Sequence, residues 1–189
     1  STSRGLGDVY KRQGDITDGY AHTATASVGD VVEYQIISKL PTITSKATSL
    51  TAYTFVDTLR EGIRYNRSDV VIEFFRDAGC TDQITAWDED SGKFVVSYDD
   101  AQNTMTIGMT ETGLADINES ESVYTDSVKR GYSDCTMRVT YAATLTADAQ
   151  LGDTDNPNEV VLTWKRTNTG YFDTLQDCCH VYTLSLIHI

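Results

Sequence analysis

Apolar and polar residues alternate with a period of two in several short stretches of this chain. Within residues 27–41, Val32, Tyr34 and Ile36 alternate with polar neighbours until a proline ends the pattern. The stretch 135–145, CTMRVTYAATL, shows the most regular alternation. Successive side chains of a β-strand point to opposite faces, so both stretches predict strands with one buried face.

Short segments of the same kind recur at a spacing of about ten residues along the rest of the chain. The predicted strands are residues 27–41, 52–59, 70–77, 93–100, 103–109, 135–145, 159–166 and 179–183. The pair at 93–100 and 103–109 has the pattern of a hairpin, and the polar stretch 113–131 predicts a short helix or a loop. Many short strands without interleaved helices predict an all-β sandwich.

The two ends of the chain do not share this pattern. DVYKRQ, which ends at residue 13, and LSLIHI, residues 184–189, back-translate into opposite strands of the mosaic end of a transposase-based sequencing adapter. We therefore assign residues 1–13 and 184–189 to sequencing-adapter scar and exclude them from fold prediction. Residues 14–183 are interpreted as a single domain, truncated at both ends, from a longer reading frame in metagenomic DNA.

Composition narrows the classes of partner. The chain carries 28 acidic and 15 basic side chains, a net charge of −13. This charge argues against nucleic acid and against contact with an anionic membrane. Its 11 tyrosines, together with many threonines and valines, favour strands over helices.

Four cysteines offer no metal-binding pattern. Cys80, Cys135, Cys178 and Cys179 lack CxxC spacing, and the histidines do not complete a zinc site. We expect no metal and no cofactor. Export would permit a disulfide between Cys80 and Cys135, whereas free thiols would suit a reducing environment, and the sequence leaves both open.

Three stretches in series resemble a known family. They are SVGDVVEYQIISKLP (27–41), YTFVDTLREGIRY (53–65) and RVTYAATLTADAQLGDTDNPNEVVLTWKRTN (138–168). In this order and spacing they are similar to the fimbrial isopeptide-formation D2 domain of Gram-positive pilins and surface adhesins. The resemblance covers nearly all of residues 22–168.

The resemblance implies an immunoglobulin-like β-sandwich of the collagen-adhesin type with a covalent Lys–Asn isopeptide bond. A lysine buried in a core loses its charge and becomes a nucleophile, while a buried acid transfers protons as ammonia leaves. Carried over to this sequence, the acid is Asp57 in FVDTL. The electrophile is Asn158 in NPNEVVL, with Asn156 as the alternative.

The nucleophile of the family pattern is missing. The family's lysine lies about a dozen residues before the Val-Gly-Asp turn, where residues 15–27 contain none. Either this domain has lost the nucleophile, or the native lysine lies upstream of this fragment, and we favour the second. Lys11, within the adapter segment, would replace it only by accident. The remaining candidates, Lys39, Lys46 and Lys93, fall at strand ends or in loops. The chain as it stands is expected to form no isopeptide bond.

These features predict a structural module of a Gram-positive surface pilus or adhesin stalk, located at the cell wall and without enzymatic activity. Its expected partners are sister domains of the same chain, pilus subunits or a host-surface ligand. The alternative is a ligand- or carbohydrate-binding sandwich of an adhesin tip. That reading would use Trp87 or Trp164 against a sugar and the oxygen-rich loops 87–92 and 152–159 for calcium.

Overall fold

The structure, a computed structural model, describes residues 9–13, 28–44, 49–119, 129–147, 158–166 and 177–183. Its helices are η2 (Glu89–Ser91, one 3₁₀ turn) and α1 (Glu111–Glu119). Its strands are β1 (Val9–Gln13), β2 (Val31–Lys39), β3 (Leu50–Thr58), β4 (Ile63–Tyr65), β5 (Val71–Phe75), β6 (Gln83–Trp87), β7 (Phe94–Asp99), β8 (Thr104–Met109), β9 (Thr136–Leu145), β10 (Asn158–Arg166) and β11 (Asp177–Thr183).

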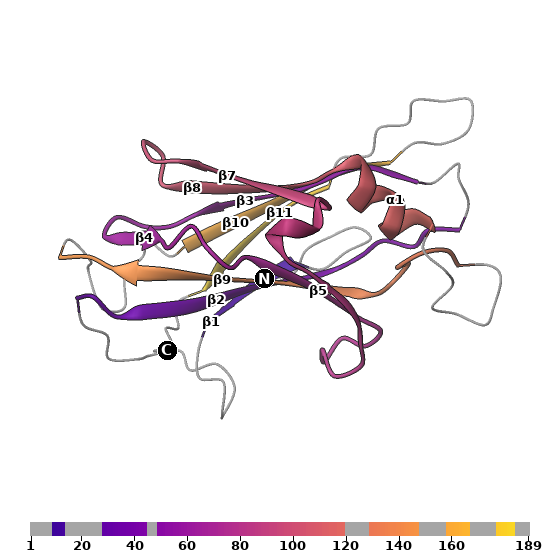
Figure 1. Cartoon of the computed structure of the whole chain (residues 1–189), viewed down its shortest axis with the longest axis horizontal. Helices are drawn as coiled ribbons and strands as arrows, with labels where there is room; N and C mark the ends of the chain where they lie inside the picture. The colour runs from indigo at the N-terminus through magenta and orange to yellow at the C-terminus, as the bar shows by residue number, and fades with distance from the viewer. Residues whose placement is uncertain are drawn as a thin grey trace.

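The strands form two antiparallel sheets that pack face to face. The first sheet has the order β1-β2-β9-β5-β6, with β4 also paired to β9, and the second has the order β11-β10-β3-β8-β7. Figure 1 shows the two layers, with β3, β7 and β8 in one and β1, β2 and β9 in the other. This arrangement confirms the predicted immunoglobulin-like β-sandwich.

The two-residue alternation sets which side chains enter the core. In β9 the side chains of Val139, Tyr141 and Ala143 are buried, while the intervening residues are partly exposed. Strand β2 pairs with β9 so that Tyr34 lies opposite Tyr141 and Ile36 opposite Val139. A shift of one residue would turn every apolar side chain outward, so burial fixes this register.

Both open sides of the sandwich are bridged by the chain itself. On one side β1, at the edge of the first sheet, contacts β11 and β10 of the second sheet. On the other side the chain crosses from β6 to β7 through η2. The N-terminal strand β1 of the first sheet therefore lies beside β10 and β11 of the second.

The structure departs from the predicted elements at three strands. Val9–Gln13, within the segment assigned to adapter sequence, form β1 on the edge of β2. The three-residue β4 is too short to show a period, and β6 has mostly half-exposed side chains and therefore little contrast. In the polar stretch 113–131, the short helix is the correct alternative, although it begins earlier, at Glu111.

Helix α1 closes one end of the sandwich (Figure 1). The Thr110 hydroxyl accepts a hydrogen bond from the Gly113 N–H at 3.1 Å, as an N-capping residue does. Near its other end, buried Asn118 pairs with the backbone of Leu50. The Leu50 N–H donates to Oδ1 at 2.8 Å, and Nδ2 donates to the Leu50 carbonyl at 3.0 Å. The amide thus replaces a strand partner at the start of β3.

Replacing Asn118 with alanine should lower the free energy of unfolding by about 2 kcal/mol, because it leaves two buried backbone groups of Leu50 without partners. Urea unfolding measures the change. Thr112→Ala, an exposed position on the same helix, is the control and should cost less than about 0.5 kcal/mol. Equal losses in the two variants would show that the Asn118 side chain does not anchor β3.

Candidate functional site

A carboxyl group lies between the two sheets. Asp57, near the end of β3, has a relative exposure of 0%. Among the residues whose burial the structure describes, no other Asp, Glu, Lys or Arg is buried. Charged groups are almost never fully buried without specific partners, so this position calls for a functional explanation.

Two tyrosine hydroxyl groups bind this carboxyl group from the opposite sheet. Tyr65 of β4 and Tyr141 of β9 both donate to Asp57 Oδ2, each at 2.7 Å. The Tyr65 hydroxyl also lies 2.8 Å from the backbone carbonyl oxygen of Asp57. Hydrogen bonds to a charged acceptor are stronger than those between neutral groups, so the three side chains connect the two sheets through one oxygen.

Both tyrosines stay protonated. Burial raises the pKa of Tyr65 far above its usual range, and the negative charge and hydrogen bond of Asp57 raise it further. Burial and the nearby Asp57 charge likewise raise the pKa of Tyr141 well above its ordinary value. The two hydroxyls are therefore permanent donors to Asp57 in the folded protein.

Aromatic rings hold the two donors in place. The ring of Tyr141 stacks on Tyr34, with centroids 5.3 Å apart and an interplanar angle of 9°. The Tyr65 ring packs between Tyr141 and Tyr98, at centroid distances of 5.8 and 5.5 Å. Such ring pairs add specific geometry to apolar burial, so neither hydroxyl moves freely.

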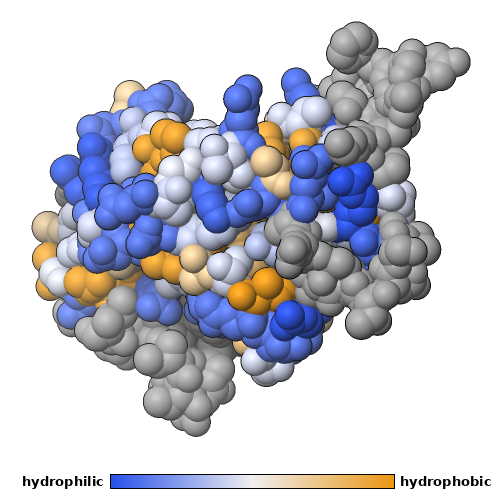
Figure 2. Space-filling model, turned by 45° about the vertical axis from the view of Figure 1, so that its right-hand side comes forward, coloured by the Kyte–Doolittle hydropathy of each residue, from blue (hydrophilic) through white to orange (hydrophobic). Residues whose placement is uncertain are grey.

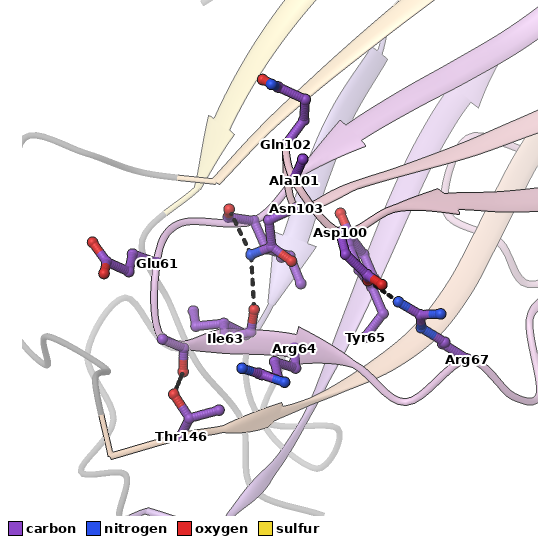
Figure 3. Close-up of a pocket in the computed structure, with 12 residues that line it drawn as sticks. Glu61, Ile63, Arg64, Tyr65, Arg67, Asp100, Ala101, Gln102, Asn103 and Thr146 are labelled. Carbon is purple, nitrogen blue, oxygen red and sulfur yellow. Dashed lines mark hydrogen bonds and ion pairs between the residues drawn. The ribbon is translucent and has the colours of Figure 1, made fainter.

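The turn between β3 and β4 brings Tyr65 back to Asp57. A surface pocket of about 780 Å³ borders this turn (Figure 3). Asn103, in the loop between β7 and β8, donates through Nδ2 to the carbonyls of Leu59 at 3.0 Å and Ile63 at 2.9 Å. Arg67 and Asp100, which also line the pocket, form an ion pair. The hydrogen bonds of Asn103 stabilise the turn.

The predicted electrophile lies on the strand next to Asp57. Val160 of β10 is directly opposite Asp57 in the antiparallel pair. Asn158, two residues earlier, occupies the same face of the strand because faces alternate with a period of two. The alternative, Asn156, lies outside the described residues. The backbone register therefore places position 158 on the face of β10 that Val160 shares with Asp57.

Lys11 of β1 pairs with a core residue of β2. Lys11 lies opposite Ile36. Gln13 lies opposite Tyr34, and Tyr34 in turn lies opposite Tyr141, so Gln13, Tyr34 and Tyr141 form one row across β1, β2 and β9. Residues opposite each other in an antiparallel pair share a face, so positions 11 and 13 both lie on the face of the buried Ile36 and Tyr34. The structure describes the backbone of these positions.

The other lysines are surface amines or fall outside the described residues. Lys39 is exposed at the end of β2. Lys93 forms an ion pair with Asp116 and lies 5.3 Å from the ring centroid of Trp87. Lys46 lies outside the described residues. Lys39 ends β2 and Lys93 directly precedes β7, which agrees with the prediction that these lysines fall at strand ends or in loops.

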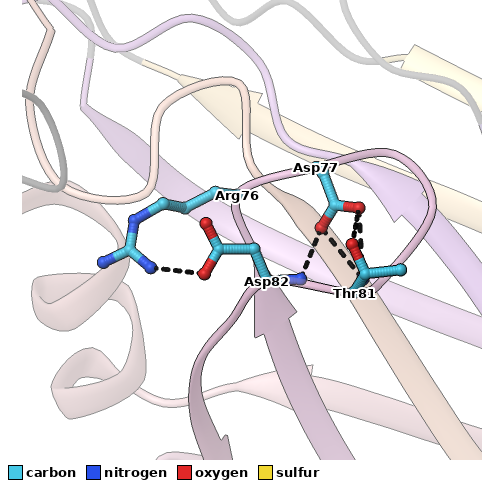
Figure 4. A network of polar contacts seen from close by, with 4 residues as sticks. All are labelled: Arg76, Asp77, Thr81 and Asp82. Carbon is cyan, nitrogen blue, oxygen red and sulfur yellow. Dashed lines mark hydrogen bonds and ion pairs between the residues drawn. The ribbon is translucent and has the colours of Figure 1, made fainter.

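The two candidate disulfide partners are not bonded to each other in the structure. Cys135 is buried just before β9, whereas Cys80 is partly exposed in the β5–β6 loop. Asp77 anchors this loop, since its carboxylate accepts from the Thr81 hydroxyl at 2.6 Å and the Asp82 N–H at 2.8 Å (Figure 4). These hydrogen bonds, that of the Thr81 hydroxyl first, lower the pKa of Asp77 to about 2.

The structure argues against sugar or calcium binding by the described residues that the sequence suggested for it. Trp87 and Trp164 are 2% and 3% exposed, so neither offers a ring face to a sugar. In the loop 87–92, Glu89 accepts from the Val70 N–H at 3.2 Å. No group of three or more metal-binding side chains occurs among the described residues, and most of the loop 152–159 lies outside them.

The surface is mainly polar. Figure 2 shows hydrophilic residues over most of the coloured face, with hydrophobic residues in small separate groups. Val28 and Val95 are the large apolar side chains that are clearly exposed within the described segments. In those segments no helix has the length and apolar character needed to cross a bilayer.

The sequence pattern identified Asp57 and Asn158 as site candidates but missed the two tyrosines. Tyr65 ends the second family-like stretch, and Tyr141 lies in the third, so both were within the motifs. Their separation from Asp57, by 8 and 84 positions, hides the contact. A signal did exist, because Tyr141 occupies a buried position in the most regular alternating strand.

No protein-family model matches this sequence, and no curated protein is similar to it in sequence. Membership of the D2 family therefore stays a prediction.

The fold is shared with solved structures of Gram-positive pilins. The pilus backbone RrgB of Streptococcus pneumoniae aligns with a TM-score of 0.54 and 18% identity over 86% of this chain. The full-length major pilin SpaD of Corynebacterium diphtheriae aligns with a TM-score of 0.58 and 18% identity over 93%. A 35 kDa C-terminal fragment of the major pilin of Streptococcus agalactiae aligns with a TM-score of 0.59 and 15% identity over 93%. The chain spans only 53%, 33% and 56% of these three structures, respectively.

Proposed function

We propose that this chain is a structural module of a Gram-positive surface pilus or adhesin stalk, of a kind in which a Lys–Asn isopeptide bond cross-links two strands. In this function it lies outside the cell, at the cell wall, and bears mechanical load instead of converting a substrate. Its partners are sister domains of the same polypeptide and further pilus subunits. The shared fold with pilus backbone proteins supports this proposal.

One observation carries the proposal: the buried Asp57 lies between β10 and Tyr141 of the opposite sheet. Val160 of β10 is opposite Asp57, so position 158 shares the face of Asp57. Tyr141 is in line, across β2, with position 13 of β1. Strands β1 and β10 also contact each other. Burying an acid costs stability in a sandwich that only packs, which supports a reactive role for Asp57.

The chemistry follows from the positions of the three groups. An uncharged lysine amine on β1 attacks the side-chain carbonyl carbon of Asn158 and forms a new C–N bond. The C–N bond to the amide nitrogen breaks, and this nitrogen leaves as ammonia. Asp57 takes the proton from the attacking amine and returns it to the leaving nitrogen, so no outside reagent is needed. The folded core replaces a bimolecular encounter by proximity.

Placing a lysine at position 13 should start this reaction. The chain with Gln13→Lys is expected to lose about 17 Da, one ammonia, after folding, as measured by intact-protein mass spectrometry. The chain as given, with Lys11 two positions away, should keep its full mass. The reason is register: position 13 lies opposite Tyr34, level with the Asp57 partner Tyr141, and position 11 does not.

Three matched variants test the assignment. Asn158→Ala or Asp57→Ala in the Gln13→Lys chain should restore the full mass, whereas Asn66→Ala, an asparagine away from the core, should leave the loss unchanged. Peptide mapping should locate the bond between residues 13 and 158. A folded Gln13→Lys protein that keeps its full mass would contradict the covalent function, and the module would then serve by packing alone.

A further inference from the structure

The carboxylate of Asp57 receives its two tyrosine donors on a single oxygen. The Tyr65 and Tyr141 hydroxyls both lie 2.7 Å from Oδ2, and they come from β4 and β9 of the opposite sheet. An ionised carboxylate oxygen has about two lone-pair sites. The two hydroxyls therefore use the acceptor capacity of Oδ2, so this oxygen cannot also exchange a proton with a third group.

We propose that Tyr65 and Tyr141 are positioning residues for the cross-linking reaction, which fix the acid through Oδ2 and assign the proton transfer to Oδ1. This inference rests on the proposed function. In the reaction, Oδ1 of Asp57 takes the proton of the lysine amine as its nitrogen bonds to the Asn158 carbonyl carbon. The same oxygen then gives the proton to the amide nitrogen, which leaves as ammonia.

The geometry around the tyrosines supports a positioning role. Tyr65 bonds both the carboxylate and the backbone carbonyl of Asp57, which limits rotation of the acid about its own side-chain bonds. Tyr141 is held by its stacking on Tyr34, with ring planes 9° apart. The donors belong to the first sheet and the acid to the second, so the angle of the carboxyl group depends on how the sheets pack.

The two donors keep their protons. Burial and the nearby Asp57 charge raise the pKa values of Tyr65 and Tyr141. Both hydroxyls therefore donate to Oδ2 throughout the reaction, and neither supplies the proton that leaves with the ammonia.

Removal of single hydroxyl groups tests this inference in the full chain carrying Gln13→Lys. Tyr65→Phe and Tyr141→Phe keep the rings and should each slow the loss of about 17 Da by about tenfold, with about a hundredfold effect in the double variant. Tyr98→Phe is the matched control, because Tyr98 packs on Tyr65 from the surface side. Its rate should stay within about twofold of the parent.

A destabilised variant away from the site separates positioning from general stability. Asn118→Ala removes hydrogen bonds between α1 and the start of β3 and does not touch Asp57. Under conditions in which all proteins are folded, as judged by circular dichroism, it should keep the parent rate, whereas Tyr65→Phe and Tyr141→Phe should stay slower.

The outcomes distinguish the inference from the function on which it rests. Equal rates in the parent and both phenylalanine variants, or an equal slowing in Asn118→Ala, would overturn the positioning role and leave the cross-link in place. Full mass in the folded Gln13→Lys parent would overturn both. Slower reaction in the two site variants, but not in Tyr98→Phe or Asn118→Ala, would support both.

Discussion

Asp57→Ala is expected to lower the free energy of unfolding by about 3 kcal/mol and, in a chain with a core lysine, to abolish cross-linking. The variant leaves the Tyr141 hydroxyl, which is buried with its ring, without its carboxylate acceptor. Tyr65 keeps only its contact with the backbone carbonyl. The removed atoms also leave a cavity between the sheets, which adds to the loss. Denaturant unfolding and intact mass measure the two effects.

Asp57→Asn separates stability from chemistry. Its amide keeps an oxygen that can accept from the tyrosines, so the stability loss should be about 1 kcal/mol. Its amide cannot carry a proton between the amine and the leaving nitrogen, so cross-linking should still be lost. If Asp57→Ala were as stable as the parent, the cost of burying the carboxylate would outweigh its two hydrogen bonds, and the acid would be retained for reactivity alone.

Gly131→Ala should reduce the free energy of unfolding by about 4 kcal/mol or more. Gly131 has a φ of +54°, and an added Cβ would lie 2.0 Å from the carbonyl oxygen of Ile117. The Cβ is fixed rigidly to Cα and the oxygen belongs to the helix backbone, so the end of helix α1 would have to move away from the turn that leads into β9. Thermal and denaturant unfolding would report the loss.

Gly92→Ala is the matched control for this prediction. Gly92 also has a positive φ, +74°, but an added Cβ would meet nothing within 4 Å. It should therefore show the cost of the backbone conformation alone, about 1 kcal/mol. Similar losses in Gly92→Ala and Gly131→Ala would mean that α1 and the turn adjust easily, and that the close approach of Gly131 to Ile117 is not required by the fold.

The strands were predictable where local pattern and burial agree. Residues 136–145 alternate cleanly because one face of β9 packs in the core and the other is partly exposed. The same applies to β3, β7 and β8, whereas residues 34–38 of β2 are all buried. The pattern fails at β6, an edge strand with little difference between its faces, and at β4, which has three residues. Both depend on pairing with neighbours that are distant in sequence.

The candidate site, like the fold, was predictable only where it depends on residues that are close in sequence. A single motif identified Asp57 as an acid in a strand, and another placed Asn158 at the start of a strand, since each depends on a short run of neighbouring residues. The position of β1 was not predicted, because residues 9–13 match an adapter sequence and not a strand pattern. Its pairing with β2 is a property of the sheet edge and not of the segment alone.

Local order along the chain was enough to derive an all-β fold and a resemblance to a self-crosslinking module, because alternation and turn residues act over a few positions. The convergence of Tyr65 and Tyr141 on one oxygen of Asp57 required the folded molecule. It depends on the register of Tyr141 opposite Tyr34, on a turn held by Asn103, and on the packing of two sheets. Contacts between residues 84 positions apart are set by the whole hydrophobic core, and no short segment contains that information.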